Sequence, residues 1–273
     1  MFEVSNSYYK ELDKNIIREK FNHLIICFDP TWKKIGVNLS GGADSALLTF
    51  FLCSIIKKHN LKTKVDVITY QRCWETRPWQ GYVSIQVYNK LKNMFPDIIC
   101  DRLTTFIPPE LEHGVSGEII NGRSGDQIIV GSFNNFAAWN YNLDAVFNAT
   151  SKNPSFNNRE DRMTNRDKDA VDGSLNDLWQ TSRKKIQAYP FKFVQKDWIV
   201  AQYHLYKIPD LYYTTRSCEG DITLNPKLKE VCGHYKDYKD GMDIPICGEC
   251  WWCDERDWAE RRMPEIVKEI QNG

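Results

Sequence analysis

The feature that most constrains this chain is a glycine-rich loop between two apolar runs. Residues 35–39 (Ile-Gly-Val-Asn-Leu) have the composition of a buried strand, and residues 46–52 (Ala-Leu-Leu-Thr-Phe-Phe-Leu) that of a buried helix. The loop between them, residues 40–45, is Ser-Gly-Gly-Ala-Asp-Ser. This order predicts a strand, a tight loop and a helix, which together begin a β-α-β unit.

The loop has the chemistry of a phosphate-binding site. Gly41 and Gly42 let backbone N–H groups approach an anion closely, because they carry no side chain. Asp44 or Ser45 can cap the following helix, whose N-terminus adds about half a positive charge. Ser40 and Ser45 add hydroxyl donors, so a pyrophosphate fits better than a lone carboxylate. The loop is neither a Walker A loop nor a dinucleotide-binding Gly-x-Gly-x-x-Gly, and an ordinary turn is the alternative.

Composition and charge indicate a folded protein. Of its 273 residues 42% are hydrophobic and 13% aromatic, which is enough for the core of one large α/β domain. Lys+Arg and Asp+Glu both number 36, so the overall charge favours neither nucleic acid nor a membrane surface. No apolar stretch reaches the roughly 20 residues of a membrane span, and no apolar signal segment opens the sequence. We therefore expect a cytoplasmic protein.

Alternating and helical patterns continue the β-α-β order beyond the loop. They predict a Rossmann-like α/β fold, an open parallel sheet with helices on both faces, as a single domain over residues 1–273. The expected elements are helices at 8–23, 46–58, 82–95 and from Lys196 to Pro209, and strands at 35–39, 65–70, 98–103 and 127–130.

Polar side chains follow two of the expected strands. Residues 70–72 (Tyr-Gln-Arg) end one of them, and Asn134 and Asn135 follow the strand that ends at Gly131. Because ligands bind outside the carboxyl ends of strands in an open α/β sheet, these side chains are candidates for nucleotide or ring recognition. Ordinary turn residues are the alternative.

A long polar segment interrupts the pattern at residues 151–176, where Phe156 is the single aromatic residue. A segment of this composition buries little surface. Because long loops inside compact domains are usually functional or disordered, we expect a mobile insertion or lid.

Three cysteines within seven residues indicate a metal site. Cys247, Cys250 and Cys253 form a double Cys-x-x-Cys, and in a cytoplasmic chain this spacing favours metal over disulfides. Three thiolates need a fourth ligand; we expect Cys218, and Cys232 and His234 are rivals. Structural Zn²⁺ is the main interpretation, and an iron–sulfur cluster or a redox pair are the alternatives. The scattered cysteines are expected to be small buried apolar groups: Cys27, Cys53, Cys73 and Cys100.

The loop and the cysteine segments together resemble a known family. The loop at 40–45 is similar to the Ser-Gly-Gly-x-Asp-Ser loop of the PP-loop ATP pyrophosphatases. Residues 214–220 (Thr-Thr-Arg-Ser-Cys-Glu-Gly) and 247–256 (Cys-Gly-Glu-Cys-x-x-Cys-x-x-Arg) resemble the zinc-binding segments of the 7-cyano-7-deazaguanine (preQ0) synthases within that group. Residues 190–200 also resemble the family, and residues 70–72 are similar to its Tyr-Gly-Gln-Arg without the glycine.

The resemblance implies an activity and a set of partners. The family adenylates the carboxylate of 7-carboxy-7-deazaguanine with ATP, lets ammonia displace AMP to give the amide, and adenylates again to give the nitrile for queuosine-type nucleic-acid modification. It implies ATP, Mg²⁺ and Zn²⁺ as cofactors, a deazapurine carboxylate and ammonia as substrates, no direct nucleic-acid or membrane partner, and a homodimer. It also implies a small zinc-binding subdomain at residues 214–262.

Each implied role falls on specific residues of this sequence. Lys196 would neutralise charge that develops in the transition state, and an exposed lysine at a helix start is the alternative. The implied catalytic residues are Lys196, Asp44 and Ser45. The nucleotide and Mg²⁺ would contact Ser40, Gly41, Gly42, Asp44, Ser45, Tyr70, Gln71, Arg72 and Gly131. The substrate would contact Asn134, Asn135, Trp139 and Arg216, and zinc would bind Cys218, Cys247, Cys250 and Cys253.

The sequence departs from the family on the substrate side. Where the family has Tyr-Pro-Asp-Cys-Arg, this chain has Trp-Asn-Tyr-Asn-Leu-Asp at residues 139–144, and the Pro-x-Arg-Asn segment has no match. The interval between Cys218 and Cys247 is also longer. Three other functions stay open: the same adenylation of a protein carboxylate or another heterocycle, modification of a tRNA base such as thiolation, and a non-catalytic zinc-bearing binding module.

Overall fold

A central parallel sheet organises the protein in the computed structural model, which describes residues 15–71, 79–107, 125–152, 154, 186–218, 246–248 and 250–272. The sheet has five strands in the order β5-β4-β3-β6-β7, and every pairing is parallel. Its strands are β3 (Lys34–Asn38), β4 (Lys64–Gln71), β5 (Ile99–Phe106), β6 (Ala145–Phe147) and β7 (Ile186–Ala188).

The order of the strands places a switch point beside the glycine-rich loop. The chain leaves β3 for β4 and β5 on one side, then crosses to β6 and β7 on the other. Val37 of β3 is in register with Val67 of β4 and with Phe147 of β6. The carboxyl end of β3 is therefore the switch point of the sheet, the place where open α/β sheets bind ligands, and residues 40–45 follow it.

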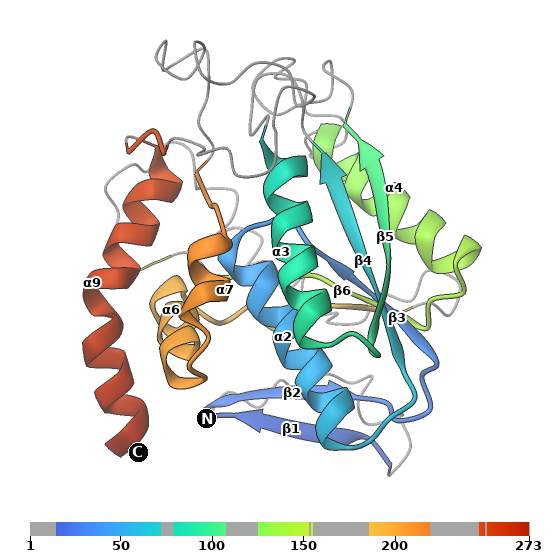
Figure 1. Ribbon diagram of the computed structural model, residues 1–273, viewed down its shortest axis with the longest axis horizontal. Helices are drawn as coiled ribbons and strands as arrows, with labels where there is room; N and C mark the ends of the chain where they lie inside the picture. The colour runs from blue at the N-terminus through green and yellow to red at the C-terminus, as the bar shows by residue number, and fades with distance from the viewer. Residues whose placement is uncertain are drawn as a thin grey trace.

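Helices cover both faces of the sheet (Figure 1). Residues of β4 alternate between two apolar clusters: Val65 and Val67 face one, and Ile68 and Tyr70 face the other. The first face carries α2 (Ala43–Lys58), α3 (Gln80–Met94), α6 (Lys196–Leu205), α7 (Pro209–Thr214) and α9 (Trp251–Asn272), and the second carries α4 (Gly125–Asn140). The predicted α/β class with helices on both faces is therefore confirmed.

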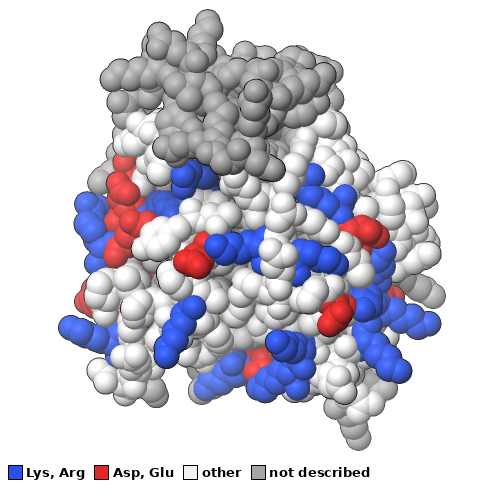
Figure 2. All heavy atoms as spheres, in the orientation of Figure 1, with Lys and Arg blue, Asp and Glu red and all other residues white. Residues whose placement is uncertain are grey.

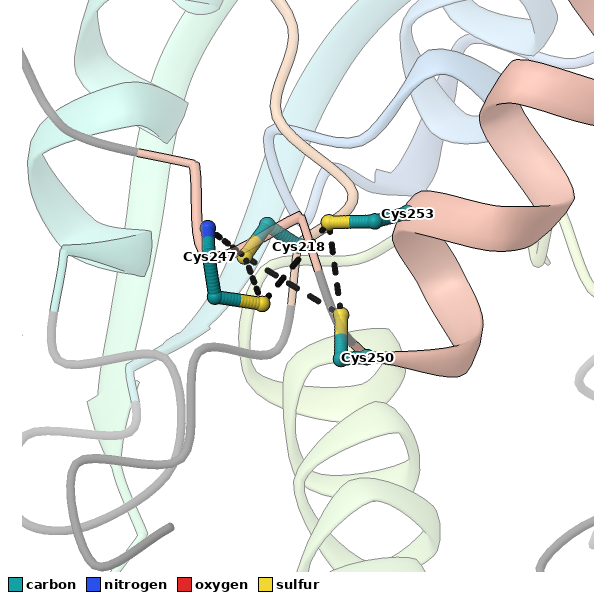
Figure 3. Close-up of side chains that lie close together, drawn as sticks. All are labelled: Cys218, Cys247, Cys250 and Cys253. Carbon is teal, nitrogen blue, oxygen red and sulfur yellow. Dashed lines mark hydrogen bonds between the residues drawn. The ribbon is translucent and has the colours of Figure 1, made fainter. Parts of the chain in front are cut away.

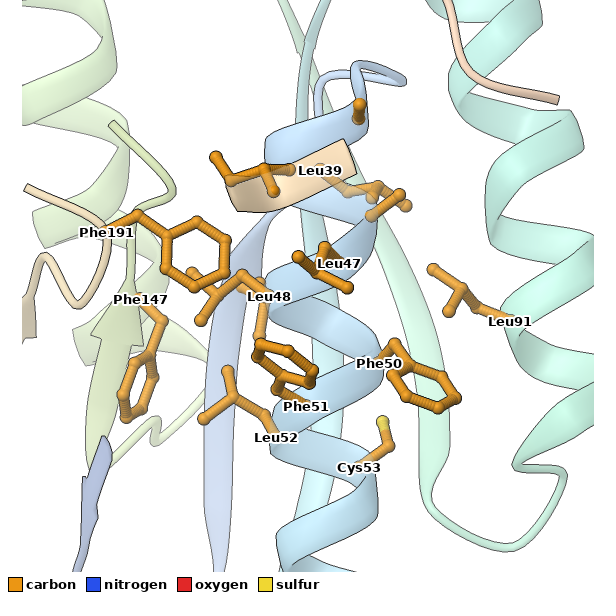
Figure 4. Packing of buried hydrophobic residues seen from close by; sticks show 14 of the residues in the cluster. Leu39, Leu47, Leu48, Phe50, Phe51, Leu52, Cys53, Leu91, Phe147 and Phe191 are labelled. Atoms are coloured by element: carbon orange, nitrogen blue, oxygen red, sulfur yellow. The ribbon is translucent and has the colours of Figure 1, made fainter. Parts of the chain in front are cut away.

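Helix α2 is buried on nearly every side (Figure 4). Phe51, fully buried, stacks on Phe21 with ring centroids 3.9 Å apart and meets Phe191 edge to face. Burying one such side chain stabilises the fold by about 1.5–3 kcal/mol. A helix held this firmly fixes the position of the loop at its N-terminus.

The segment before the sheet is a hairpin, not the helix that we expected over residues 8–23. Strands β1 (Ile17–Phe21) and β2 (Leu24–Phe28) pair antiparallel, and Asn22 takes a left-handed φ of 55° in the turn. Exposure alternates along β1, which is the period of a strand. The helical spacing of apolar residues gave a wrong prediction because pairing with β2 decides the conformation of β1. Residues 8–14 lie outside the described part of the chain.

The strand expected at 127–130 lies within helix α4, so that prediction is wrong. Its β-branched composition reflects a helix that covers an apolar sheet face, where Val130 packs. The expected position in the sheet is taken by β6, which has three buried residues. Helix α6 also ends earlier than expected, at Leu205, and Pro209 begins α7. The other expected strands and helices between residues 35 and 103 are confirmed within a few residues.

Candidate active site

The loop before α2 requires glycine at one position. Gly41 has a φ of +84°, and a Cβ there would lie 3.0 Å from the backbone nitrogen of Ser84 and from the side chain of Val83. Gly42, at the N-cap of α2, has extended backbone and offers no capping side chain. The N–H groups of the first turn of a helix have no intrahelical partner, so they remain suited to an anion.

Hydrogen bonds within the loop hold its shape. The Ser45 hydroxyl donates to the Gly42 carbonyl oxygen at 3.0 Å and accepts from the backbone N–H of Ser40 at 3.2 Å. The backbone N–H of Gly42 donates to the Ser40 hydroxyl at 3.3 Å. Ser45 is buried whereas Ser40 is exposed, so Ser45 supports the loop and Ser40 faces the outside.

A buried lysine meets the loop from α6. The Lys196 ammonium donates to Asp44 Oδ1, and Asp44 Oδ2 accepts from the Ser151 hydroxyl at 3.0 Å. A second carboxylate, Glu255 Oε2 on α9, lies 3.8 Å from Lys196 Nζ. Lys196 is 3% exposed, so the alternative of an exposed lysine at a helix start is wrong.

Two carboxylates approach the ammonium of Lys196. Asp44 Oδ1 accepts from it, and Glu255 Oε2 lies 3.8 Å away. Charges interact more strongly where water is excluded, because less solvent screens them. Asp44 is the more accessible carboxylate, with a side chain 15% exposed, and is therefore the one that an added cation could reach.

The start of α6 is anchored independently. The Asp197 carboxylate accepts from the Trp198 backbone N–H at 2.8 Å and pairs with Arg262 of α9 at 3.0 Å. Deeper in the same region, the buried Tyr203 hydroxyl donates to the Ala43 carbonyl oxygen at 2.5 Å. Helices α2, α6 and α9 are thus fastened together around Lys196.

A backbone contact connects the loop to the first cysteine segment. The Arg216 N–H donates to the Gly41 carbonyl oxygen at 3.0 Å. One residue earlier, the Thr215 carbonyl oxygen accepts from Arg256 of α9 at 3.0 Å, and the guanidinium of Arg256 lies 4.2 Å from the ring centroid of Tyr212. The loop and α9 are therefore held by the same short segment.

Four cysteine sulfurs meet beside this segment (Figure 3): Cys218 follows α7, Cys247 and Cys250 lie just before α9, and Cys253 lies in its first turn. All four Sγ atoms lie within 4.8 Å of one another. Four sulfurs about 2.3 Å from a tetrahedral ion would lie about 3.8 Å apart. The Sγ distances in the structure are 3.4 Å for Cys218–Cys247, 3.5 Å for Cys250–Cys253, 3.8 Å for Cys247–Cys253 and 4.0 Å for Cys218–Cys250.

The thiols are hard to ionise without a cation. Hydrogen bonds from Cys250 and Cys253, together with burial, raise the pKa of Cys218 far above its usual range. For Cys253, the hydrogen bond to Cys218 lowers the pKa, but the bond to Cys250 and burial outweigh it and raise the pKa to about 12. Crowded thiolates become favourable when a bound ion supplies positive charge, so the donor set fits a metal.

The amide side chains expected at a strand end lie on helix α4 instead. Asn134 is buried and accepts from the Tyr70 hydroxyl, whose pKa is raised by burial. Asn135 accepts from Gln187 of β7 at 3.3 Å, and the Tyr189 hydroxyl donates to Gln187 at 3.2 Å. These five residues form a polar group on the side of the sheet that α4 covers.

The remaining site predictions fall in several places. Gln71 is buried at the end of β4, and Trp139 is 46% exposed on α4. Gly131 also lies on α4, and among the described residues no neighbour lies within 4 Å of the position of its Cβ. Arg72, Cys73, Cys232, His234 and most of the insertion at 151–176 lie outside the described residues. Cys27 and Cys53 are buried as expected, whereas Cys100 is partly exposed.

Two residues beside Lys196 and Asp44 were not predicted from the sequence: Glu255 and Ser151. Glu255 is a glutamate with 0% exposure, and with Ala259 and Ile266 it follows the buried stripe of α9. A charged residue in an apolar stripe is a signal that could have been found. Ser151 carried no comparable signal, because it opens a segment rich in polar residues.

Charged side chains are dispersed on the face shown in Figure 2. Among the described residues of that face, Lys and Arg lie in small groups separated by acidic and uncharged residues. None of the helices in the described part of the chain combines the length and apolar composition that a membrane crossing requires.

Comparison with known proteins gives a distant structural similarity. No family model matches the chain, and no curated protein matches it. Among solved structures it is similar to the U34-tRNA thiolase NcsA from Methanococcus maripaludis, which was solved with its 4Fe-4S cluster. The two are 11% identical, the similarity covers 88% of this chain and 71% of that one, and the TM-score is 0.46. A similarity this distant carries no argument about substrate or cofactor.

Proposed function

We propose that this chain is an ATP-dependent enzyme of the PP-loop pyrophosphatase type that activates a carboxylate by adenylation. The observation that carries the proposal is the buried contact of Lys196 with Asp44 at the start of α2. A lysine held out of water beside a helix N-terminus is suited to a polyanion, because burial strengthens its interaction with charge. A lysine that only solubilised a surface would keep its ammonium in water.

Each part of the loop has a role in this proposal. The first-turn N–H groups of α2 bind the ATP phosphates, and the Asp44 carboxylate binds the Mg²⁺ that accompanies them. Lys196 neutralises the charge that develops on the leaving pyrophosphate. Gly41 and Ser45 keep the loop in the required shape.

The acceptor that we propose is the carboxylate of 7-carboxy-7-deazaguanine. Its oxygen attacks the α-phosphorus of ATP and pyrophosphate leaves; ammonia then attacks the acyl carbon, and AMP leaves to give the amide. A second adenylation on the amide oxygen, followed by loss of AMP and protons, gives the nitrile. Support comes from the joint resemblance of residues 40–45, 214–220 and 247–256 to the preQ0 synthases.

We further propose that the four cysteines bind one structural Zn²⁺. Four of their six Sγ–Sγ distances are 3.4–4.0 Å, and all four Sγ atoms lie within 4.8 Å of one another, which is compatible with one tetrahedral ion. A 4Fe-4S cluster would separate the sulfurs further, because its four thiolates bind four different irons. When bound, the ion supplies folding free energy to the segment that contacts the loop.

Mass spectrometry of a reaction with ATP, Mg²⁺, ammonium and 7-carboxy-7-deazaguanine tests the substrate. The expected products are the nitrile, AMP and pyrophosphate, and the Lys196→Met variant should form them at least about 100-fold more slowly. Formation of the amide alone would show that the enzyme catalyses the first adenylation and amide formation, without the second adenylation that gives the nitrile. Adenylation that proceeds normally in Lys196→Met would contradict the assigned role.

A different acceptor for the same chemistry is the second candidate, and the position of Asn134 favours it. Asn134 lies on helix α4 and accepts a hydrogen bond from the Tyr70 hydroxyl. The family's substrate motif was expected directly after a strand instead. The protein carrying Mg-ATP would then release no pyrophosphate on addition of 7-carboxy-7-deazaguanine. Release stimulated instead by another heterocyclic carboxylate or by a protein would support this candidate.

A further inference from the structure

Glu255 has an unusual position for a glutamate. Its exposure is 0%, and its Oε2 lies 3.8 Å from the ammonium of Lys196, which is itself 3% exposed. Burying a carboxylate costs several kcal/mol unless a cation or hydrogen bonds compensate. A glutamine or leucine would occupy the same place in the helix without that cost, so the charge is the feature to explain.

The second partner of Lys196 has another task in the proposed function. Asp44 is the carboxylate that Mg²⁺ would take, and a cation on Asp44 weakens its attraction for the Lys196 ammonium. Glu255 approaches Lys196 from α9, whereas Asp44 belongs to α2, and it keeps a negative charge beside the ammonium. Without Glu255, the attraction that holds the Lys196 ammonium in place would weaken when Mg²⁺ binds Asp44, which is the step in which Lys196 is needed.

The cysteine group lies next to the part of α9 that carries Glu255. Glu255 lies two residues after Cys253 and directly before Arg256, which donates to the Thr215 carbonyl oxygen. The first two turns of α9 therefore contact both the cysteine group and the segment that contacts Gly41. Displacing a catalytic group by about 1 Å can cost about 100-fold in rate, so this support has functional weight.

We propose that Glu255 is a positioning residue that holds Lys196 at the phosphate loop, so that the metal site supports ATP chemistry through it. The inference rests on the proposed function for the role of Lys196. It assigns a task to the buried charge of α9 that neither phosphate binding nor metal ligation requires.

The first test measures the position of Lys196 without ATP chemistry. The full-length metal-loaded protein and its Glu255→Gln variant are pulse-labelled with acetic anhydride, and mass spectrometry compares Lys196 with the exposed Lys268. Glutamine keeps the shape and removes the charge. Acetylation of Lys196 relative to Lys268 should rise about tenfold in Glu255→Gln and stay unchanged in Glu265→Gln, a matched change at an exposed site on α9. Unchanged labelling in both variants would overturn the proposal.

The second test measures the consequence in pyrophosphate exchange into ATP. Glu255→Gln should lower the maximal exchange rate about tenfold and leave the KM for ATP within about twofold. In a Lys196→Met background the same substitution should have no further effect, because Glu255 acts through Lys196. An effect that persists in that background, or loss of bound metal from Glu255→Gln, would assign Glu255 a general structural role instead.

The proposed function and the role of Glu255 can be contradicted independently. A wild-type protein that neither binds ATP nor exchanges pyrophosphate would overturn the proposed function, whereas the labelling result would still decide whether Glu255 holds Lys196. Normal exchange in the wild type together with normal exchange in Glu255→Gln would overturn only the present inference.

Discussion

Gly41 shows how one residue determines whether the phosphate loop can form. Its φ of +84° is costly for any residue with a Cβ, and the space beside it is filled by the backbone of Ser84. Gly42, its neighbour, has a φ of −81°, and a Cβ there would meet nothing closer than 3.4 Å. Of the two adjacent glycines, the backbone conformation therefore requires glycine only at position 41.

Gly41→Ala should lower the free energy of unfolding by about 1–3 kcal/mol, because strain and the contact with Ser84 add together. Gly42→Ala is the matched control and should change it by less than about 1 kcal/mol. Urea denaturation of both variants measures the difference. Equal losses in the two variants would show that the left-handed conformation of Gly41 is not required.

The stability of the protein should depend on pH through the carboxylate of Glu19 on β1. Burial raises its pKa, but hydrogen bonds from Lys58, the last residue of α2, and from His59, which follows it, outweigh this and bring the pKa below its usual value. Because the folded-state pKa is lowered, the stabilisation is present above pH 4.5 and is lost as pH falls through the folded pKa. Glu19→Gln should thus cost about 0.5–1 kcal/mol at pH 7, and this cost should shrink as pH falls below 4.5.

Thermal unfolding of wild type and Glu19→Gln across this pH range provides the measurement. Glu265→Gln, at an exposed position on α9, serves as the control and should show no such trend. A stability difference that stays constant from pH 7 to pH 3 would argue against the ionic contribution.

At the scale of elements, α9 depends on the cysteine group at its start. Removing the metal leaves four buried or half-buried thiols whose crowding no longer has a compensating charge. Chelation, or the substitution Cys250→Ser, should lower the Tm of the metal-loaded protein by about 5 °C or more. Cys100→Ser, a partly exposed cysteine outside the group, should change it little. Scanning calorimetry with parallel metal analysis checks this, and a chelated protein of unchanged Tm would contradict it.

Arg256 connects α9 to the segment before Cys218. Arg256→Lys keeps the charge but loses the planar group that stacks on Tyr212 and donates to Thr215. The expected loss in the free energy of unfolding is about 1–2 kcal/mol. The exposed Arg261→Lys should be nearly neutral, and chemical denaturation compares the two. Equal stability of both variants would mean that charge alone suffices.

The sequence predicted those elements whose pattern is local. Strand β4 and helix α3 have the composition and period of their structures: β4 is a β-rich run buried on both faces, and α3 buries one face against neighbours close in sequence. The hairpin β1–β2 and the short strand β6 depend on pairing partners that no local pattern reveals. Residues 127–130 misled because β-branched residues also suit a helix that covers a sheet.

At the scale of the whole molecule, the candidate site combines parts that are distant in the sequence. The phosphate loop and the double Cys-x-x-Cys were visible because their residues are contiguous. The contacts of Lys196 with Asp44, of Ser151 with Asp44 and of Arg216 with Gly41 join segments more than 100 residues apart, and only the folded chain brings them together. Cys218 was named from the sequence, and its rivals lie outside the described residues.

The contact between the phosphate loop and α9 also has a consequence for synthesis on the ribosome. Chains emerge from the N-terminus onward, so residues 40–45 can form their loop long before residues 251–272 exist. A nascent chain therefore carries the phosphate loop without the cysteines, Arg256 or Glu255 that surround it in the folded protein. We expect the loop to gain these contacts only after α9 has left the exit tunnel and docked, so its final surroundings form long after its own residues are made.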